Sequence, residues 1–194
     1  MIEEKEILKF IGNKADTYLK KEQFSIKVFE TVTSTNTLAK ESAERGASEG
    51  TVFIAEEQTE GRGKLGRRFF SPKGTGIYLS IVLRPKISMD KSTYITTVAA
   101  VAVTESIEKV LSIKVDIKWV NDIFFNNKKV GGILTEASFD TKNSNFNYAI
   151  LGIGLNIEKP QNGFPNDLEE IVTAILEEQK NDVRNKIIAE ILNT

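Results

Sequence analysis

The segment Glu60–Gly76 limits the fold more than any other part of the chain, because it is rich in glycine and yet leads into a strand. Its 17 residues include five glycines and one proline, and hydrophobic runs at 51–55 and 77–83 flank it as predicted strands. Gly61–Gly66 has the spacing G-x-G-x-x-G, but a dinucleotide-binding loop of that spacing opens a helix. A Walker A loop needs Lys-Ser/Thr after its last glycine, where this chain has two arginines. Both of those nucleotide-binding folds are therefore excluded.

The remaining hydrophobic pattern predicts helices and strands in irregular alternation. Helices are predicted over 5–21, from a start within 33–36 to Gly46, and over 94–111, 166–176 and 183–192. Further strands are predicted over 25–32, 115–119, 123–125, 130–135 and 148–157. Asn126-Asn127 suits a hairpin turn, and Asn166-x-x-Glu169 resembles a capping box. We therefore expect a single α+β domain with a mixed, largely antiparallel β-sheet and helices on one side.

Two of these segments carry expectations about burial. The helix over 94–111 is apolar nearly all round in its first half, which predicts burial against the sheet. In the strand over 115–119 the residues alternate, so Val115, Ile117 and Trp119 face one way. If Trp119 belongs to the core, Lys118 projects from the opposite face.

Two residue types are missing, and their absence narrows the chemistry. The chain has no Cys and no His, which excludes thiolate nucleophiles, Ser-His-Asp triads and His- or Cys-ligated zinc. An enzyme with this composition works with Lys, Arg, carboxylates, amides and hydroxyls, as suits phosphoryl or nucleotidyl transfer. No apolar stretch reaches 18 residues, and the first 23 residues carry five basic and five acidic side chains. We expect a cytoplasmic protein that binds neither membrane nor, at a net charge of −1, nucleic acid.

Positive charge is concentrated in the glycine-rich segment. Residues 60–73 carry five basic side chains and a single acid, Glu60, giving a local charge of +4. Glycines let backbone N–H groups approach an anion closely, and arginines supply forked donors. A solvated flexible loop explains the same composition equally well. The aromatic pair Phe69-Phe70 favours a functional interpretation, because an exposed aromatic ring beside cations suits a purine.

Three further motifs have structural as well as functional explanations. The string from Lys118 to Asp122 reads as a surface lysine followed by a polar turn. Gly152 and Gly154, inside an apolar strand, indicate either a ligand or backbone that presses close, or a bulge. Ser34-Thr35-Asn36 is explained by helix capping alone.

In combination, these motifs resemble the catalytic domain of the biotin protein ligases (biotin–[acetyl-CoA-carboxylase] ligases). The resemblance covers residues 28–157 closely. The motifs that carry it follow one another in the order Ser34-Thr-Asn36, Gln58, Gly61-Arg-Gly-Lys-Leu-Gly-Arg67, Ser71-Pro72, Lys118-Trp-Val-Asn-Asp122, Lys129-Val-Gly-Gly-Ile-Leu-Thr-Glu136 and Gly152-Ile-Gly-Leu-Asn156.

The resemblance implies a fold of the biotin and lipoate ligase type, akin to class II aminoacyl-tRNA synthetases, and an ATP-dependent reaction. The family forms biotinyl-5′-AMP from biotin and Mg-ATP and then transfers biotin to a lysine of a carrier domain, the biotin carboxyl carrier protein. Mg²⁺ would be held mainly by phosphates, with no protein metal site. Homodimers are common in the family. A lipoate-type ligase and a catalytically weak biotin-binding paralogue remain as alternatives.

The resemblance also implies roles for individual residues. Lys118 and Arg62 would be catalytic, bridging the biotin carboxylate and the α-phosphate. The residues that would bind biotin are Ser34, Thr35, Gln58, Arg62, Gly132, Gly152 and Gly154. The residues that would bind the nucleotide are Lys64, Arg67, Phe69, Lys118, Asn121, Lys129 and Asn156.

Members of the family often carry flanking domains. We expect residues 1–194 to form one catalytic domain, without a winged-helix DNA-binding domain before it. We also expect the small C-terminal β-barrel of about fifty residues that is usual in the family to be absent.

Overall fold

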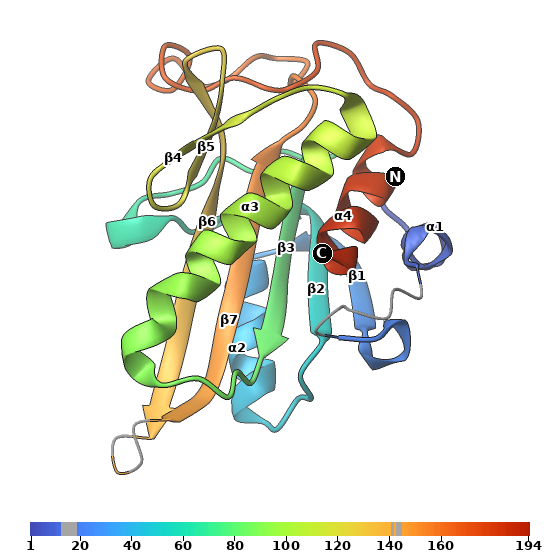
Figure 1. The fold of residues 1–194 in the computed structure, drawn as a ribbon. Helices are drawn as coiled ribbons and strands as arrows, with labels where there is room; N and C mark the ends of the chain where they lie inside the picture. The colour runs from blue at the N-terminus through green and yellow to red at the C-terminus, as the bar shows by residue number, and fades with distance from the viewer. Residues whose placement is uncertain (13–18, 141, 143–144) are drawn as a thin grey trace.

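The computed structural model describes residues 1–12, 19–140, 142 and 145–194, and its described strands form one seven-stranded sheet (Figure 1). The spatial order is β1-β2-β3-β7-β6-β5-β4. The strands are β1 (Ser25–Val32), β2 (Thr51–Gln58), β3 (Gly76–Leu83), β4 (Asp116–Lys118), β5 (Asp122–Phe125), β6 (Lys128–Asp140) and β7 (Asn145–Asn156). β1 and β2 are parallel and every other neighbouring pair is antiparallel, which confirms the predicted mixed, largely antiparallel α+β fold.

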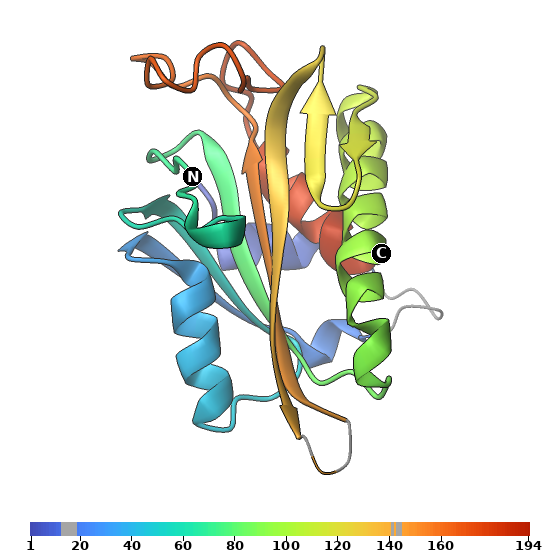
Figure 2. The same cartoon turned by 90° about the vertical axis from the view of Figure 1, so that its left-hand side faces the viewer.

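The helices lie on both faces of the sheet, so the expectation of helices on one side was wrong. The α-helices are α1 (Glu4–Phe10), α2 (Thr35–Glu44), α3 (Ser92–Leu111) and α4 (Val183–Asn193), and the 3₁₀ turns are η1 (Lys21–Gln23), η2 (Lys64–Gly66) and η3 (Met89–Lys91). Figure 2 shows α3 and α4 on one side of the sheet and α2 alone on the other. The connection between parallel strands β1 and β2 runs through α2, which accounts for its separate position.

Alternation along the central strands divides the core between the two faces. On β2, Val52 and Ile54 join the large cluster under α1, α3 and α4, whereas Phe53 packs with Ala39 and Ala43 of α2. The α2 face is therefore the thinner of the two hydrophobic layers. A cavity lies at the end of the sheet beyond the N-terminus of α2.

The predicted first helix was only partly right. α1 ends at Phe10, and the chain turns extended at Ile11; the stretch 13–18 lies outside the described residues. Ile7 and Ile11 are both buried, so these apolar residues of the predicted helix do face the core.

No helix forms over 166–176, contrary to the expectation from Asn166-x-x-Glu169. After two successive turns, in which the Pro165 and Leu168 carbonyls accept, the chain becomes extended and pairs with the sheet. The Lys129 N–H donates to the Ile171 carbonyl and the Leu176 N–H donates to the Ile157 carbonyl. β-Branched side chains favour this extended form, and their spacing fits a helix equally well. The segment crosses the end of the sheet near the predicted site (Figure 1, orange to red).

Two expectations about burial also failed. Tyr94 and Val98 of α3 are exposed, so this helix buries one face, through residues such as Ala100 and Val103, rather than its whole circumference. Trp119 lies beyond the end of β4 and is 76% exposed, so it does not belong to the core. No helix among the described residues is long and apolar enough to cross a bilayer.

Candidate functional site

A cavity of about 190 Å³ lies between the N-terminus of α2, the strands β6 and β7, and the loop between β2 and β3. Figure 2 shows η2 of that loop on the same side of the sheet as α2, beyond the N-terminal end of that helix. Polar side chains from α2 and β2 and cationic side chains from the loop both line the cavity. These include Ser34, Thr35, Gln58, Arg62, Lys64 and Arg67.

The loop folds back on itself to cover the cavity. Arg62 and Arg68 face each other as an antiparallel bridge, and the Gly63 N–H donates to the Arg67 carbonyl at 2.7 Å. At the tip, Leu65 has φ +57° and is 90% exposed. Gly61 has no room for a side chain, because a Cβ there would overlap the Phe69 carbonyl oxygen. The glycines thus let the two arms of the loop approach each other closely.

The floor of the cavity is a connected set of hydrogen bonds that ordinary helix capping does not explain. Ser34 is the N-cap of α2 but makes no side-chain capping bond. Instead the Gln58 Oε1 accepts from the Thr35 N–H at 2.9 Å and from the Thr35 hydroxyl at 3.1 Å. The Gln58 Nε2 then donates to the Ser71 hydroxyl, which donates to the Phe69 carbonyl. Gln58 therefore ties the helix N-terminus to the far arm of the loop.

A second cavity of about 290 Å³ adjoins the first and shares Arg67, Phe69 and Lys129 with it. Lys118 and Asn156 line only this second cavity. Each cavity is smaller than the roughly 300–1,000 Å³ usual for drug-sized ligands. The arrangement suits a ligand of two joined parts, with one part in each cavity and its anionic centre near the shared residues.

The electrostatics of the site favour an anion. No ion pair within 4 Å is formed by Lys64, Arg67 or Lys118 with any carboxylate in the described part of the chain. Lys118 instead lies 5.0 Å above the ring of Phe124. Two other cations of the site are paired: the Lys129 Nζ lies 2.6 Å from the Asp122 carboxylate, and the Arg62 Nη2 lies 2.9 Å from the Glu136 carboxylate. Clustered cations without counter-charges bind phosphate or carboxylate groups readily.

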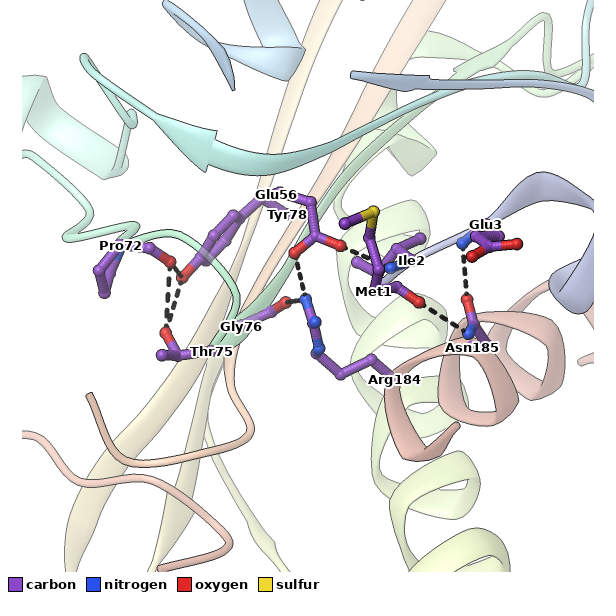
Figure 3. A network of polar contacts seen from close by, with 10 residues as sticks. All are labelled: Met1, Ile2, Glu3, Glu56, Pro72, Thr75, Gly76, Tyr78, Arg184 and Asn185. Carbon is purple, nitrogen blue, oxygen red and sulfur yellow. Dashed lines mark hydrogen bonds and ion pairs between the residues drawn. The ribbon is translucent and has the colours of Figure 1, made fainter. Parts of the chain in front are cut away.

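A buried tyrosine fixes the outgoing end of the loop. The Tyr78 hydroxyl donates to the Pro72 carbonyl at 3.0 Å and lies near Thr75 (Figure 3). Burial raises the pKa of Tyr78 to about 12, because the phenolate would lose its hydration. The ring of Phe69 packs edge-on against Tyr78, with centroids 6.3 Å apart. The Phe69 ring, which lines both cavities, is thus packed against the buried Tyr78.

The structure places all the predicted site residues around these two cavities. Twelve of them line the first cavity, namely Ser34, Thr35, Gln58, Arg62, Lys64, Arg67, Phe69, Asn121, Lys129, Gly132, Gly152 and Gly154. Lys118 and Asn156 line the second. Asn156 is buried, and its Nδ2 donates to the Thr173 carbonyl at 3.2 Å, so part of its role is to hold the segment that crosses the sheet.

The two strand glycines have structural explanations of their own. Both keep regular register with β3 and β6, so neither marks a bulge. A Cβ on Gly154 would come within 2.9 Å of the Phe69 ring, and one on Gly152 would overlap the Asn36 side chain. Side chains of the protein itself, rather than backbone, therefore press close to both positions.

The sequence analysis did not predict a role at the site for three polar residues. Ser80, Asn36 and Glu136 form a hydrogen-bonded chain that ends on Arg62. Asn36 and Glu136 stand at the ends of motifs already noted, but they are 100 positions apart. Only the fold brings them together.

The described residues contain no group of three or more Asp, Glu, His or Cys that could hold a metal ion. Asp122 is the one carboxylate lining both cavities, and it is paired with Lys129. Mg²⁺ is commonly bound through one or two carboxylates together with substrate phosphates. The residues present fit a metal that arrives with its nucleotide better than a resident metal.

Comparison with known proteins connects this site to one family. The model of the Biotin/lipoate A/B protein ligase family matches residues 28–156. The "Bifunctional ligase/repressor BirA" of Bacillus subtilis is 42% identical over 144 residues, which are 74% of this chain and 44% of that protein. A "Biotin--[acetyl-CoA-carboxylase] ligase" of Mycobacterium tuberculosis is 27% identical over 148 residues, 74% of this chain and 53% of that protein. The chain spans about half the length of these relatives.

Solved structures give the same result for the fold. A biotin protein ligase from Aquifex aeolicus in complex with biotin and ATP has a TM-score of 0.69 and 31% identity, covering 87% of this chain and 67% of that one. A biotin protein ligase from Leishmania major in complex with biotinyl-5-AMP has a TM-score of 0.64 and 28% identity, covering 87% and 74%. Because the family model matches about two thirds of the chain, the chain belongs to the Biotin/lipoate A/B protein ligase family.

Proposed function

We propose that the chain is an ATP-dependent biotin protein ligase that forms biotinyl-5′-AMP and transfers biotin to a lysine of a biotin carboxyl carrier protein domain. The observation that carries the proposal is the pair of adjoining cavities, one with a polar floor and one lined by Lys118 and Phe69, under a loop whose cations include Lys64 and Arg67. Related structures whose titles name biotin with ATP, or biotinyl-5-AMP, support the choice of substrates.

In the first step, a carboxylate oxygen of biotin attacks the α-phosphorus of ATP, and the bond to pyrophosphate breaks. Two anions must meet, so the rate depends on cations that neutralise both. We assign this task to Arg62, from the loop, and to Lys118, from the second cavity. In the second step, the lysine amine of the carrier attacks the biotinyl carbonyl, and AMP leaves.

The remaining assignments follow the shapes of the two cavities. Ser34, Thr35 and Gln58 would bind the ureido group of biotin, and the backbone at Gly132 would line the same pocket. Gln58 is well suited, because its Nε2 uses one hydrogen for Ser71 and keeps a second for a ligand.

The nucleotide would occupy the second cavity. Phe69 would stack against the adenine, and Asn156 would contact the nucleoside. Asn121, which lines the first cavity, would contact the nucleotide from that side. The cations Lys64, Arg67 and Lys129 would neutralise the phosphates, and bound Mg²⁺ would add positive charge to them. The proposed location of the reaction is the cytoplasm.

Pyrophosphate release tests the proposal. The purified chain is given Mg-ATP with biotin, with lipoate, or with neither, and pyrophosphate is measured over time. The proposal predicts release that depends on biotin. Release with lipoate alone would point to a lipoate-type ligase, and biotin binding without release would point to a binding paralogue; either result would overturn the proposal.

A further inference from the structure

Gly152 lies under the side chain of Asn36. Its partners across the sheet are Ser80 on β3 and Leu134 on β6, so it occupies the centre of three paired strands. A Cβ at this position would overlap the Asn36 Oδ1. The missing side chain therefore makes room for an asparagine that reaches down from the first turn of α2.

The amide of Asn36 is held in one orientation by both neighbouring strands. The Ser80 hydroxyl donates to the Asn36 Oδ1 at 2.6 Å, and the Asn36 Nδ2 donates to the Glu136 Oε2 at 2.9 Å. Asn36 is 6% exposed and Ser80 is fully buried. Because a buried amide without partners is costly, a flipped amide, with its oxygen against a carboxylate, is strongly disfavoured.

The carboxylate of Glu136 in turn holds Arg62. Arg62 Nη2 lies 2.9 Å from Glu136 Oε1 and Nη1 lies 3.2 Å from Oε2, so the pair is bidentate. Bidentate pairs fix direction as well as distance. The chain of contacts thus runs from Ser80 on β3, through Asn36 on α2 and Glu136 on β6, to Arg62 of the loop.

We infer that Glu136, oriented by Asn36 over Gly152, is a positioning residue that sets the direction of the Arg62 guanidinium and anchors the incoming arm of the loop. Two of the five N–H donors of Arg62 are used by Glu136, which leaves three for a ligand anion. An arginine next to two glycines would otherwise be free to turn away. The identity of that anion as the biotin carboxylate rests on the proposed function, whereas the anchoring does not.

Limited trypsin digestion without ligand tests the anchoring. Cleavage after Lys64, Arg67 and Arg68 is followed by mass spectrometry in four chains: unchanged, Glu136→Gln, Arg62→Gln and the double variant. Cleavage of a closed loop follows how often it opens. Each single variant should be cut about three to ten times faster than the unchanged chain, and the double variant no faster than Arg62→Gln alone.

A matched control uses the other end of the same loop. Lys73 pairs with the exposed Glu30, so Glu30→Gln also removes an ion pair but leaves Arg62 in place. It should leave cleavage at the three sites unchanged. Arg62 is exposed, so Arg62→Gln is expected to fold and keeps the test valid even if Glu136→Gln is unstable.

Two results would overturn the inference. One is wild-type cleavage rates in Arg62→Gln; the other is an equal acceleration by Glu136→Gln with and without Arg62. Kinetics give an independent readout: Glu136→Gln should raise the KM for biotin about tenfold in the Arg62 chain and less than twofold in the Arg62→Gln chain. If the unchanged chain releases no pyrophosphate, the proposed function fails while the digestion still decides the anchoring.

Discussion

Replacing Thr35 by valine separates ligand binding from the stability of α2. Thr35 is 3% exposed, and its hydroxyl lies 3.1 Å from Gln58 Oε1 and 2.8 Å from Ser80 Oγ. Valine removes the hydroxyl and keeps the branched shape. Neither neighbour is left unpaired, because Gln58 still accepts the Thr35 backbone N–H and Ser80 still donates to Asn36.

The two measurable effects should therefore differ in size. The free energy of unfolding should fall by about 1 kcal/mol or less, the net contribution of a typical hydrogen bond. Biotin binding should weaken by about 1–3 kcal/mol, because the ureido group would meet a methyl group in place of a hydroxyl. That corresponds to roughly 5- to 150-fold in Kd.

Calorimetric titration with biotin and urea unfolding measure the two effects. Thr51→Val is a matched control: Thr51 is also buried, and its hydroxyl donates to the Ser48 carbonyl at 2.8 Å in a turn away from the cavities. It should lower stability to a similar degree and leave the Kd for biotin unchanged. An unchanged Kd in Thr35→Val would refute the ligand role and leave Thr35 a structural residue.

Lys118→Ala should slow biotinyl-AMP formation by a factor of 10² to 10³, because losing one charge-stabilising donor costs about 3–4 kcal/mol. The affinity for biotin should change little. A variant that keeps more than a third of the rate would show that Lys118 is not catalytic. Tyr78 has a folded pKa near 12 against about 10 unfolded, so its contribution to stability is complete below pH 10 and is lost as the pH rises through 12. Urea unfolding between pH 9 and pH 12 should show a fall about 2.3 kcal/mol larger than in Tyr78→Phe, and equal falls would contradict the raised pKa. Trypsin should cut the 61–73 loop first, and biotin with a non-hydrolysable ATP analogue at about 100 times its Kd should protect it up to a hundredfold; equal rates with and without the ligands would show that the loop does not close on them.

Sequence patterns correctly predicted the elements whose structure depends on neighbouring residues. The Asn126-Asn127 turn has φ of +49° and +61°, as the hairpin pattern requires, and α4 forms where helical spacing indicated. The glycine-rich segment does join two strands of the sheet. In each case the residues that determine the structure lie within a few positions of one another.

Contacts between residues far apart in the sequence determine the structural features that the sequence patterns did not predict. The apolar spacing of Ile171, Val172 and Ile175 fits a helix, but hydrogen bonds to β6 and β7 draw the chain into an extended form. The contact between Asn36 and Glu136 spans 100 positions and has no local pattern. Capping was the simplest explanation of Ser34-Thr35-Asn36 until the fold placed Gln58 and Ser80 beside these side chains.

Mass spectrometry of the purified chain after incubation with biotin and Mg-ATP tests the central claim most directly. The chain is separated from free ligands under non-denaturing conditions, and the bound small molecules are then identified. The account predicts retained biotinyl-5′-AMP, with much less in Lys118→Ala. Recovery of unmodified biotin alone, with ATP unconsumed, would contradict the claim that these two cavities join biotin to AMP.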